Sequence, residues 1–176
     1  MGIVVSRYRS GIDAGEDGDA FRFVWGIVLS INDFLGLFTG IQVAMNWQLL
    51  LSKNPEIEQS VISMTDDLGK LTTVCRSNNG EYANGLDNEA DILTVNYSLF
   101  PEKFESELRR HQNAASIPNN FYLPVYKLPD GHLILDGNHR AVALYRSGVI
   151  PNLCMLSIKG PICAEILPDL GKWEKR

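Results

Sequence analysis

The sequence predicts an α+β fold, a small mixed sheet with flanking helices that is preceded by a helical N-terminal region. Apolar residues at helical spacing dominate positions 20 to 52, and short β-rich runs alternate with helical patterns from residue 91 onward. Between them lies the polar stretch "RSNNGEYANGLDNEAD", with two Asn-Gly turn signals. We therefore expect a helical region over residues 1–75, a linker over 76–90 and an α+β domain over 91–176.

Composition and charge argue against several classes of protein. Of 176 residues, 45% are hydrophobic and 21% are charged, which is ordinary for a globular protein. The net charge of −5 argues against a dedicated nucleic-acid binder, because such proteins usually carry a basic surface. Cys75, Cys154 and Cys163 show no metal-ligand spacing, and their odd number favours a reducing compartment over a disulfide framework.

The N-terminal segment carries a short lipidation pattern. The start "MGIVVSRYRS" lacks the apolar region of a secretory signal, so we expect a cytoplasmic protein. Gly2 and Ser6 match the myristoylation pattern, and Arg7 and Arg9 add positive charge. A chance match is the simpler interpretation of so short a pattern. We expect no membrane association unless Gly2 is lipidated.

The N-terminal elements are expected to be helical. Residues 10 to 19 are rich in Gly and Asp and predict a loop, and residues 20 to 52 predict two helical segments divided near residues 30 to 33. The uncharged stretch 34 to 52 has amphipathic patterning, which favours a buried core helix over a membrane span. Asn54 as cap and Pro55 at the first helical position predict a further helix in "NPEIEQSVISMTDDLGKL".

The C-terminal elements follow a clearer pattern. A β-rich run in "DILTVNYSLF" precedes a helix that Pro101 opens, and Phe100, Phe104 and Leu108 give this helix a buried stripe. The remaining expected elements are the strand "FYLPVYKL", a turn at Pro129-Asp130-Gly131, the paired strand "HLILD", a helix over 139–147 with Gly148 at its end, and the strand "NLCMLSI".

The stretch "DGNHR", residues 136 to 140, is the candidate site. Asn138 is a good helix N-cap, and Gly137 permits close approach of the backbone. Free N–H groups at a helix start bind anions, Arg140 adds a fork suited to phosphate, and His139 adds a donor. Asp136 is useful beside a phosphate if it holds Mg²⁺ or accepts a proton. Asp136 and His139 are the candidate catalytic residues, and Asp136 is the candidate metal ligand.

A plain structural interpretation uses the same residues. Asp136 or Asn138 would only cap the helix, His139 would bond to backbone, and Arg140 would pair with Glu105 or Glu107.

The order strand, "DGNHR", alanine-rich helix, glycine and strand resembles the ParB/sulfiredoxin superfamily. Asp136, Gly137 and Arg140 match the Asp-Gly-His-x-Arg motif of its free-serine-kinase-like members, and Gly137, His139 and Arg140 match the Gly-Cys-His-Arg motif of sulfiredoxins. The resemblance covers about residues 90 to 160. It implies a nucleotide (ATP, ADP or CTP) whose phosphates contact residues 137 to 140, with Asp136 as the metal-associated or catalytic carboxylate.

The resemblance also implies phosphate contacts from the preceding helix, where Arg109 and Arg110 stand near the end. The alternative is that these arginines only complement the dipole of the helix. Sulfiredoxin chemistry is disfavoured because Asn138 replaces the required thiol. ParB-type DNA binding is disfavoured because only "PICAEILPDLGKWEKR" follows Gly160.

Two classes of function remain. The favoured one is a nucleotide-dependent phosphotransferase or hydrolase, a kinase or nucleoside triphosphatase, that acts on a small molecule or protein through the turn at 136 to 140. The other is a non-catalytic nucleotide-sensing or protein-interaction module. Asp136 separates them, because catalysis needs this carboxylate, whereas anion binding alone should improve without it.

Overall fold

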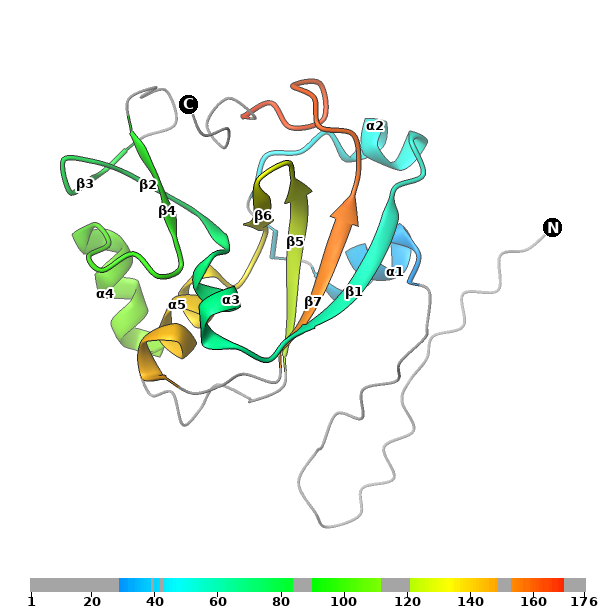
Figure 1. The fold of residues 1–176 in the computed structure, drawn as a ribbon. Coiled ribbons are helices and arrows are strands. Elements are labelled where there is room, and N and C mark those ends of the chain that lie inside the picture. The colour runs from blue at the N-terminus through cyan, green and yellow to red at the C-terminus, as the bar shows by residue number, and fades with distance from the viewer. Residues whose placement is uncertain are drawn as a thin grey trace, which may run out of the picture.

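The computed structural model describes residues 29–38, 40–41, 43–83, 90–111, 121–148 and 153–169. They form a mixed sheet with helices beside it, so the predicted α+β fold class is confirmed (Figure 1). The helices are α1 (Ile31–Leu37), α2 (Trp47–Ser52), α3 (Thr65–Gly69), α4 (Glu102–His111) and α5 (Asn138–Ser147). The strands are β1 (Glu56–Ile62), β2 (Thr72–Asn78), β3 (Glu81–Tyr82), β4 (Asp91–Thr94), β5 (Tyr122–Leu128), β6 (Gly131–Ile134) and β7 (Leu153–Lys159).

The sheet follows the order β1-β7-β5-β6-β2-β3, and β4 also pairs with β2. Two neighbouring pairs, β5 with β7 and β2 with β6, are parallel, and the other pairs are antiparallel. The parallel contact of β2 with β6 is a single register pair, Thr72 with Leu133. Strand β6 thus connects strands β1, β7 and β5 on one side of the sheet to strands β2, β3 and β4 on the other. The chain passes from the end of β6 through a short turn into α5.

Two apolar cores lie on the two faces of the sheet, because successive side chains of a strand point to opposite faces. In β5, Leu123 and Val125 belong to the core that also contains residues of α3, α4 and α5. Tyr126 and Leu128 belong to the core that also contains residues of α1 and α2. Helices α4 and α5 therefore lie together on one face, beside β2 and β4 (Figure 1).

The predicted C-terminal elements are confirmed. Helix α4 follows Pro101, β5 and β6 form the expected antiparallel pair joined by the turn at Pro129 and Asp130, and β7 follows α5. Gly148 ends α5 with φ of +67°, the left-handed conformation that glycine adopts without strain. The apolar stripe of α4 is buried as expected, at Phe104 and Leu108.

The predicted helix that begins at Asn54 is wrong. Residues 56 to 62 form strand β1, and all seven pair with β7, from Glu56 opposite Lys159 to Ile62 opposite Leu153. Asn54 has φ of +50° and lies outside any helix. Pairing with a buried neighbouring strand outweighs the local helix signals in this segment. Only the short α3 remains of the predicted helix.

The predicted break near residues 30 to 33, between two helical segments, is not where the structure places it. Ser30 and Asp33, expected near a break, form the capping box that begins α1, with the Asp33 N–H donating to Ser30 Oγ at 3.1 Å. The expected single helix over 34 to 52 is interrupted after α1, and α2 begins only at its N-cap, Asn46. Within the described part of the chain, no helix is long and apolar enough to cross a membrane.

The sheet joins strands from both sides of the predicted linker at 76–90. Residues 76 to 78 belong to β2, and Asn79 and Gly80, with φ of +51° and +83°, form the turn into β3. Strands β1 and β2 thus replace the helical structure expected for these parts of residues 1–75. The lipidation pattern at Gly2, the loop at 10 to 19 and residues 84 to 89 lie outside the described residues.

Candidate functional site

The turn between β6 and α5 is shaped by one glycine. Gly137 precedes the first turn of α5 with φ of +85°. Its N–H donates to Asp136 Oδ1 at 2.7 Å, which orients the carboxylate. A Cβ at this position would lie 3.3 Å from both Arg140 Nη2 and Leu123 Cδ1. Both the backbone conformation and the surroundings therefore favour glycine here.

Asn138 does not cap α5, which corrects the sequence prediction. Gly137 is the N-cap residue, and no side chain of the described residues caps the helix start, so the positive end of the helix dipole is left open to them. Asn138 is the first residue of the helix and is buried. Its Oδ1 instead accepts a hydrogen bond from the Val74 N–H of β2 at 3.0 Å.

A bulge in β2 makes this contact possible. Between Thr72 opposite Thr94 and Arg76 opposite Ile92, three residues of β2 face a single residue of β4. Within this bulge, the Cys75 N–H donates to Thr73 Oγ1 at 3.1 Å. The bulge thus directs the Val74 N–H toward α5, where Asn138 accepts it.

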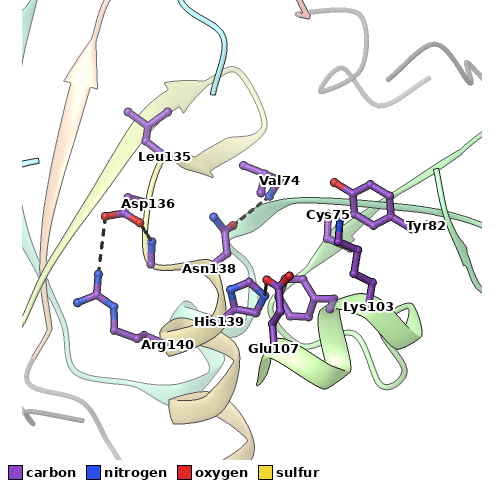
Figure 2. A pocket seen from close by; sticks show the side chains of 12 residues that line it. Val74, Cys75, Tyr82, Lys103, Glu107, Leu135, Asp136, Asn138, His139 and Arg140 are labelled. Carbon is purple, nitrogen blue, oxygen red and sulfur yellow. Dashed lines mark hydrogen bonds and ion pairs between the residues drawn. The ribbon is translucent and has the colours of Figure 1, made fainter. Parts of the chain in front are cut away.

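A pocket of about 620 Å³ opens in front of the N-terminus of α5 (Figure 2). This volume lies within the range of about 300–1,000 Å³ typical of small-molecule sites. The bulge of β2, strand β3, helix α4 and the turn after β6 supply its walls. The lining residues are Val74, Cys75, Tyr82, Lys103, Phe104, Glu107, Leu135, Asp136, Gly137, Asn138, His139 and Arg140. All five residues of the predicted site thus line one pocket.

His139 is held between two side chains of α4. Its ring stacks on Phe104 with centroids 4.1 Å apart and an interplanar angle of 27°. Its Nε2 lies 3.3 Å from Glu107 Oε2, the distance of an ion pair when the imidazole is protonated. Phe104 stacks in turn on Phe100 at 4.3 Å. The imidazole is therefore fixed in orientation on the pocket wall, as a donor or a proton-transfer group requires.

Arg140 lies beside Asp136 and not beside the glutamates of α4. Its Nη2 is 3.8 Å from Asp136 Oδ2, and its guanidinium lies over the Phe121 ring, 5.2 Å from the centroid. Both charged side chains remain about one third exposed, at 38% and 34%. This long contact leaves guanidinium donors available for a ligand anion. The pairing with Glu105 or Glu107 weighed from sequence is therefore wrong.

Arg146 holds α4 and α5 together behind the pocket. Its two terminal nitrogens donate to the two oxygens of Glu105 at 2.9 and 2.7 Å, a bidentate pair. Glu105 also accepts the Phe100 N–H at 3.0 Å. The hydrogen bonds from Arg146 lower the pKa of Glu105 below its usual value, although partial desolvation opposes them.

Of the second predicted group, Arg109 and Arg110, the structure describes only the Arg109 side chain, which is not among the residues that line the pocket. Arg109 is exposed on α4, and its Nε donates to Glu105 O at 3.4 Å. Arg110 lies in α4, and its side chain is outside the described residues. Among the described side chains of α4, Lys103, about two turns earlier on the helix, is a cation that lines the pocket.

Sequence reasoning missed three polar side chains of the pocket, Tyr82, Lys103 and Glu107. Lys103 and Glu107 are four residues apart and flank the predicted apolar stripe, so they share one side of α4. Their spacing could have been recognised in the sequence. Tyr82 follows a two-residue turn and had no sequence signal. Lys103 Nζ lies 5.7 Å from the centre of the Tyr82 ring.

Cys75 also lines the pocket and is buried. Burial raises the pKa of its thiol to about 12, so the group is protonated at neutral pH. A protonated, buried thiol is a poor nucleophile. This environment argues against thiol chemistry in the pocket. The sequence argued the same, because Asn138 stands where sulfiredoxin chemistry requires a thiol.

A metal site made by the protein alone is not seen in the described part of the chain, where no three His, Cys, Asp or Glu side chains gather around one point. Asp136 is the carboxylate nearest the open N-terminus of α5. Mg²⁺ commonly binds through one or two carboxylates together with ligand phosphates. Gly40 of the segment between α1 and α2 approaches this carboxylate, because a Cβ there would lie 3.3 Å from Asp136 Oδ2.

Comparisons of the chain with protein-family models, with curated proteins and with solved structures find no significant match.

Proposed function

We propose that the pocket binds the phosphates of a nucleotide and that the chain is a nucleotide-dependent phosphotransferase or hydrolase. The observation that carries the proposal is the convergence of the open N-terminus of α5, His139 and Arg140 on one cavity of about 620 Å³. Backbone N–H groups at a helix start and a guanidinium are groups that proteins use for phosphate. The resemblance of residues 136 to 140 to the ParB/sulfiredoxin superfamily supports the same ligand.

Asp136 is the proposed catalytic carboxylate. It lines the pocket at the start of α5, where it would accept a proton from an attacking hydroxyl or share Mg²⁺ with the bound phosphates. Bound Mg²⁺ would neutralise phosphate charge, and Asp136 is the residue that would hold it. His139, fixed by Phe104 and Glu107, would donate to a phosphate oxygen.

A non-catalytic nucleotide-binding module is the second candidate. One observation favours it: Asp136 already accepts the Gly137 N–H at 2.7 Å and faces Arg140 at 3.8 Å. In this alternative the carboxylate only shapes the turn and orients the guanidinium, and it does not take part in a reaction.

Asp136→Asn distinguishes the two candidates. We would measure phosphate release and phosphoryl transfer from ATP, ADP and CTP with Mg²⁺, and binding of the same nucleotides by calorimetry. For an enzyme, the variant retains binding and loses turnover by about 10²-fold or more. Binding by the wild type without turnover supports the module, and unchanged turnover in the variant contradicts the catalytic role of Asp136.

A further inference from the structure

The far side of the pocket carries a positive charge that the proposed phosphate turn does not use. Figure 2 shows Arg140 and Asp136 on one side of the cavity, Lys103 and Tyr82 on the other, and Asn138 and His139 between them. The cavity is therefore lined by cations on two separate sides. A single phosphate group held at the start of α5 leaves the second side unused.

Lys103 lines the pocket and makes no ion pair with a described residue. Among the described residues, no carboxylate lies within 4.0 Å of its Nζ. Glu107, one turn further along α4, faces His139 instead. The contact of Lys103 is the face of the Tyr82 ring, at 5.7 Å from the centroid. An exposed ammonium held over an aromatic ring at a pocket wall remains free to meet a ligand anion.

Tyr82 supplies a neutral donor next to this ammonium. The phenol lies on β3, which packs against α4, and 46% of the residue is exposed. Desolvation, with the neighbouring Cys75 and Glu107, raises the pKa of Tyr82, so the hydroxyl keeps its proton at neutral pH. The ammonium lies over the ring of this phenol, and both the ammonium and the phenol O–H are donors that can bind phosphate oxygens.

We propose that Lys103 and Tyr82 form a second anion subsite, and that the ligand carries an extended chain of phosphates reaching from the α5 N-terminus to this subsite. This inference rests on the proposed phosphate site and predicts that the site binds a nucleoside diphosphate or triphosphate more tightly than a monophosphate. Lys103 contributes to affinity only when the ligand is long enough to reach it.

The test compares orthophosphate with tripolyphosphate in wild type, Lys103→Gln and Lys53→Gln, by titration at constant ionic strength. Lys53 is exposed after α2 and outside the pocket lining, so its variant controls for the loss of one positive charge. We expect Lys103→Gln to weaken tripolyphosphate binding about fivefold or more and orthophosphate binding less than twofold. Lys53→Gln should leave both affinities within twofold of the wild type.

The other possible results contradict either the second subsite or the phosphate site itself. The second subsite is overturned, with the phosphate turn left intact, if Lys103→Gln weakens the binding of both ligands equally or of neither. It is also overturned if Lys53→Gln weakens tripolyphosphate binding as much as Lys103→Gln does. Absence of binding of both ligands to the wild type would overturn the proposed function itself, and the subsite with it.

Discussion

The Asn138 side chain accepts a hydrogen bond from the backbone N–H of Val74 at 3.0 Å, across 64 positions of sequence. Through this bond the first residue of α5 is attached to the bulge of β2, and the two walls of the pocket are fixed relative to each other. The bond is buried at Asn138, so its loss leaves an N–H without its acceptor.

Two substitutions at this position should separate stability from binding. Asn138→Ala removes the acceptor and should lower the free energy of unfolding by about 1–3 kcal/mol in urea denaturation. Asn138→Asp keeps an acceptor for Val74 but places a carboxylate at the proposed anion site. We expect it to retain most of the stability and to weaken nucleotide binding about tenfold or more. Tighter binding by the Asp variant would contradict a phosphate ligand.

The Arg146–Glu105 pair should make stability depend on pH. The pKa of Glu105 is lowered in the folded protein, so the pair stabilises fully above the unfolded value near 4.5 and loses its effect as pH falls through the folded value. Glu105→Gln should therefore reduce the free energy of unfolding by about 1 kcal/mol at pH 7 and by less near pH 3. Chemical denaturation at the two pH values measures the difference.

Glu102→Gln is the matched control for this prediction. It removes the same charge from the first turn of α4, but Glu102 is exposed and has no ion pair among the described residues. A Glu102→Gln variant with the same pH-dependent loss would assign the effect to the helix dipole and not to Arg146.

Cys75 should be dispensable for the function. Its thiol is buried and its pKa is raised to about 12, so we expect slow alkylation by iodoacetamide at pH 8 in the folded protein. Cys75→Ala should keep nucleotide affinity within about twofold and should keep any turnover. Loss of turnover with intact binding and folding would show that the thiol takes part in the reaction.

Sequence patterns predicted the C-terminal elements because their signals are local. Pro101 before α4, Gly131 at the start of β6, and Gly148 after α5 mark element ends by backbone chemistry alone. Residues 136 to 140 could also be predicted to lie at one site, because they are consecutive in the sequence. Such features need no knowledge of the rest of the fold.

Strand β1 and the second wall of the pocket could not be predicted in this way. Residues 56 to 62 become a strand because β7, almost a hundred residues later, pairs with them. Tyr82 and Lys103 meet only because β3 packs on α4. The role of Asn138 likewise depends on a bulge in β2 that local propensity does not encode. Long-range pairing decides each of these features.

The most direct test of the phosphate site is nucleotide binding measured by calorimetry on wild type, Arg140→Gln and Arg109→Gln. Arg140 lines the pocket at the start of α5, whereas Arg109 is exposed on α4 outside it, so the two variants lose the same charge at different places. We expect Arg140→Gln to weaken ATP or CTP binding about tenfold or more, and Arg109→Gln to bind within about twofold of wild type. Equal affinities in Arg140→Gln and wild type, or no nucleotide binding by the wild type, would contradict the phosphate site.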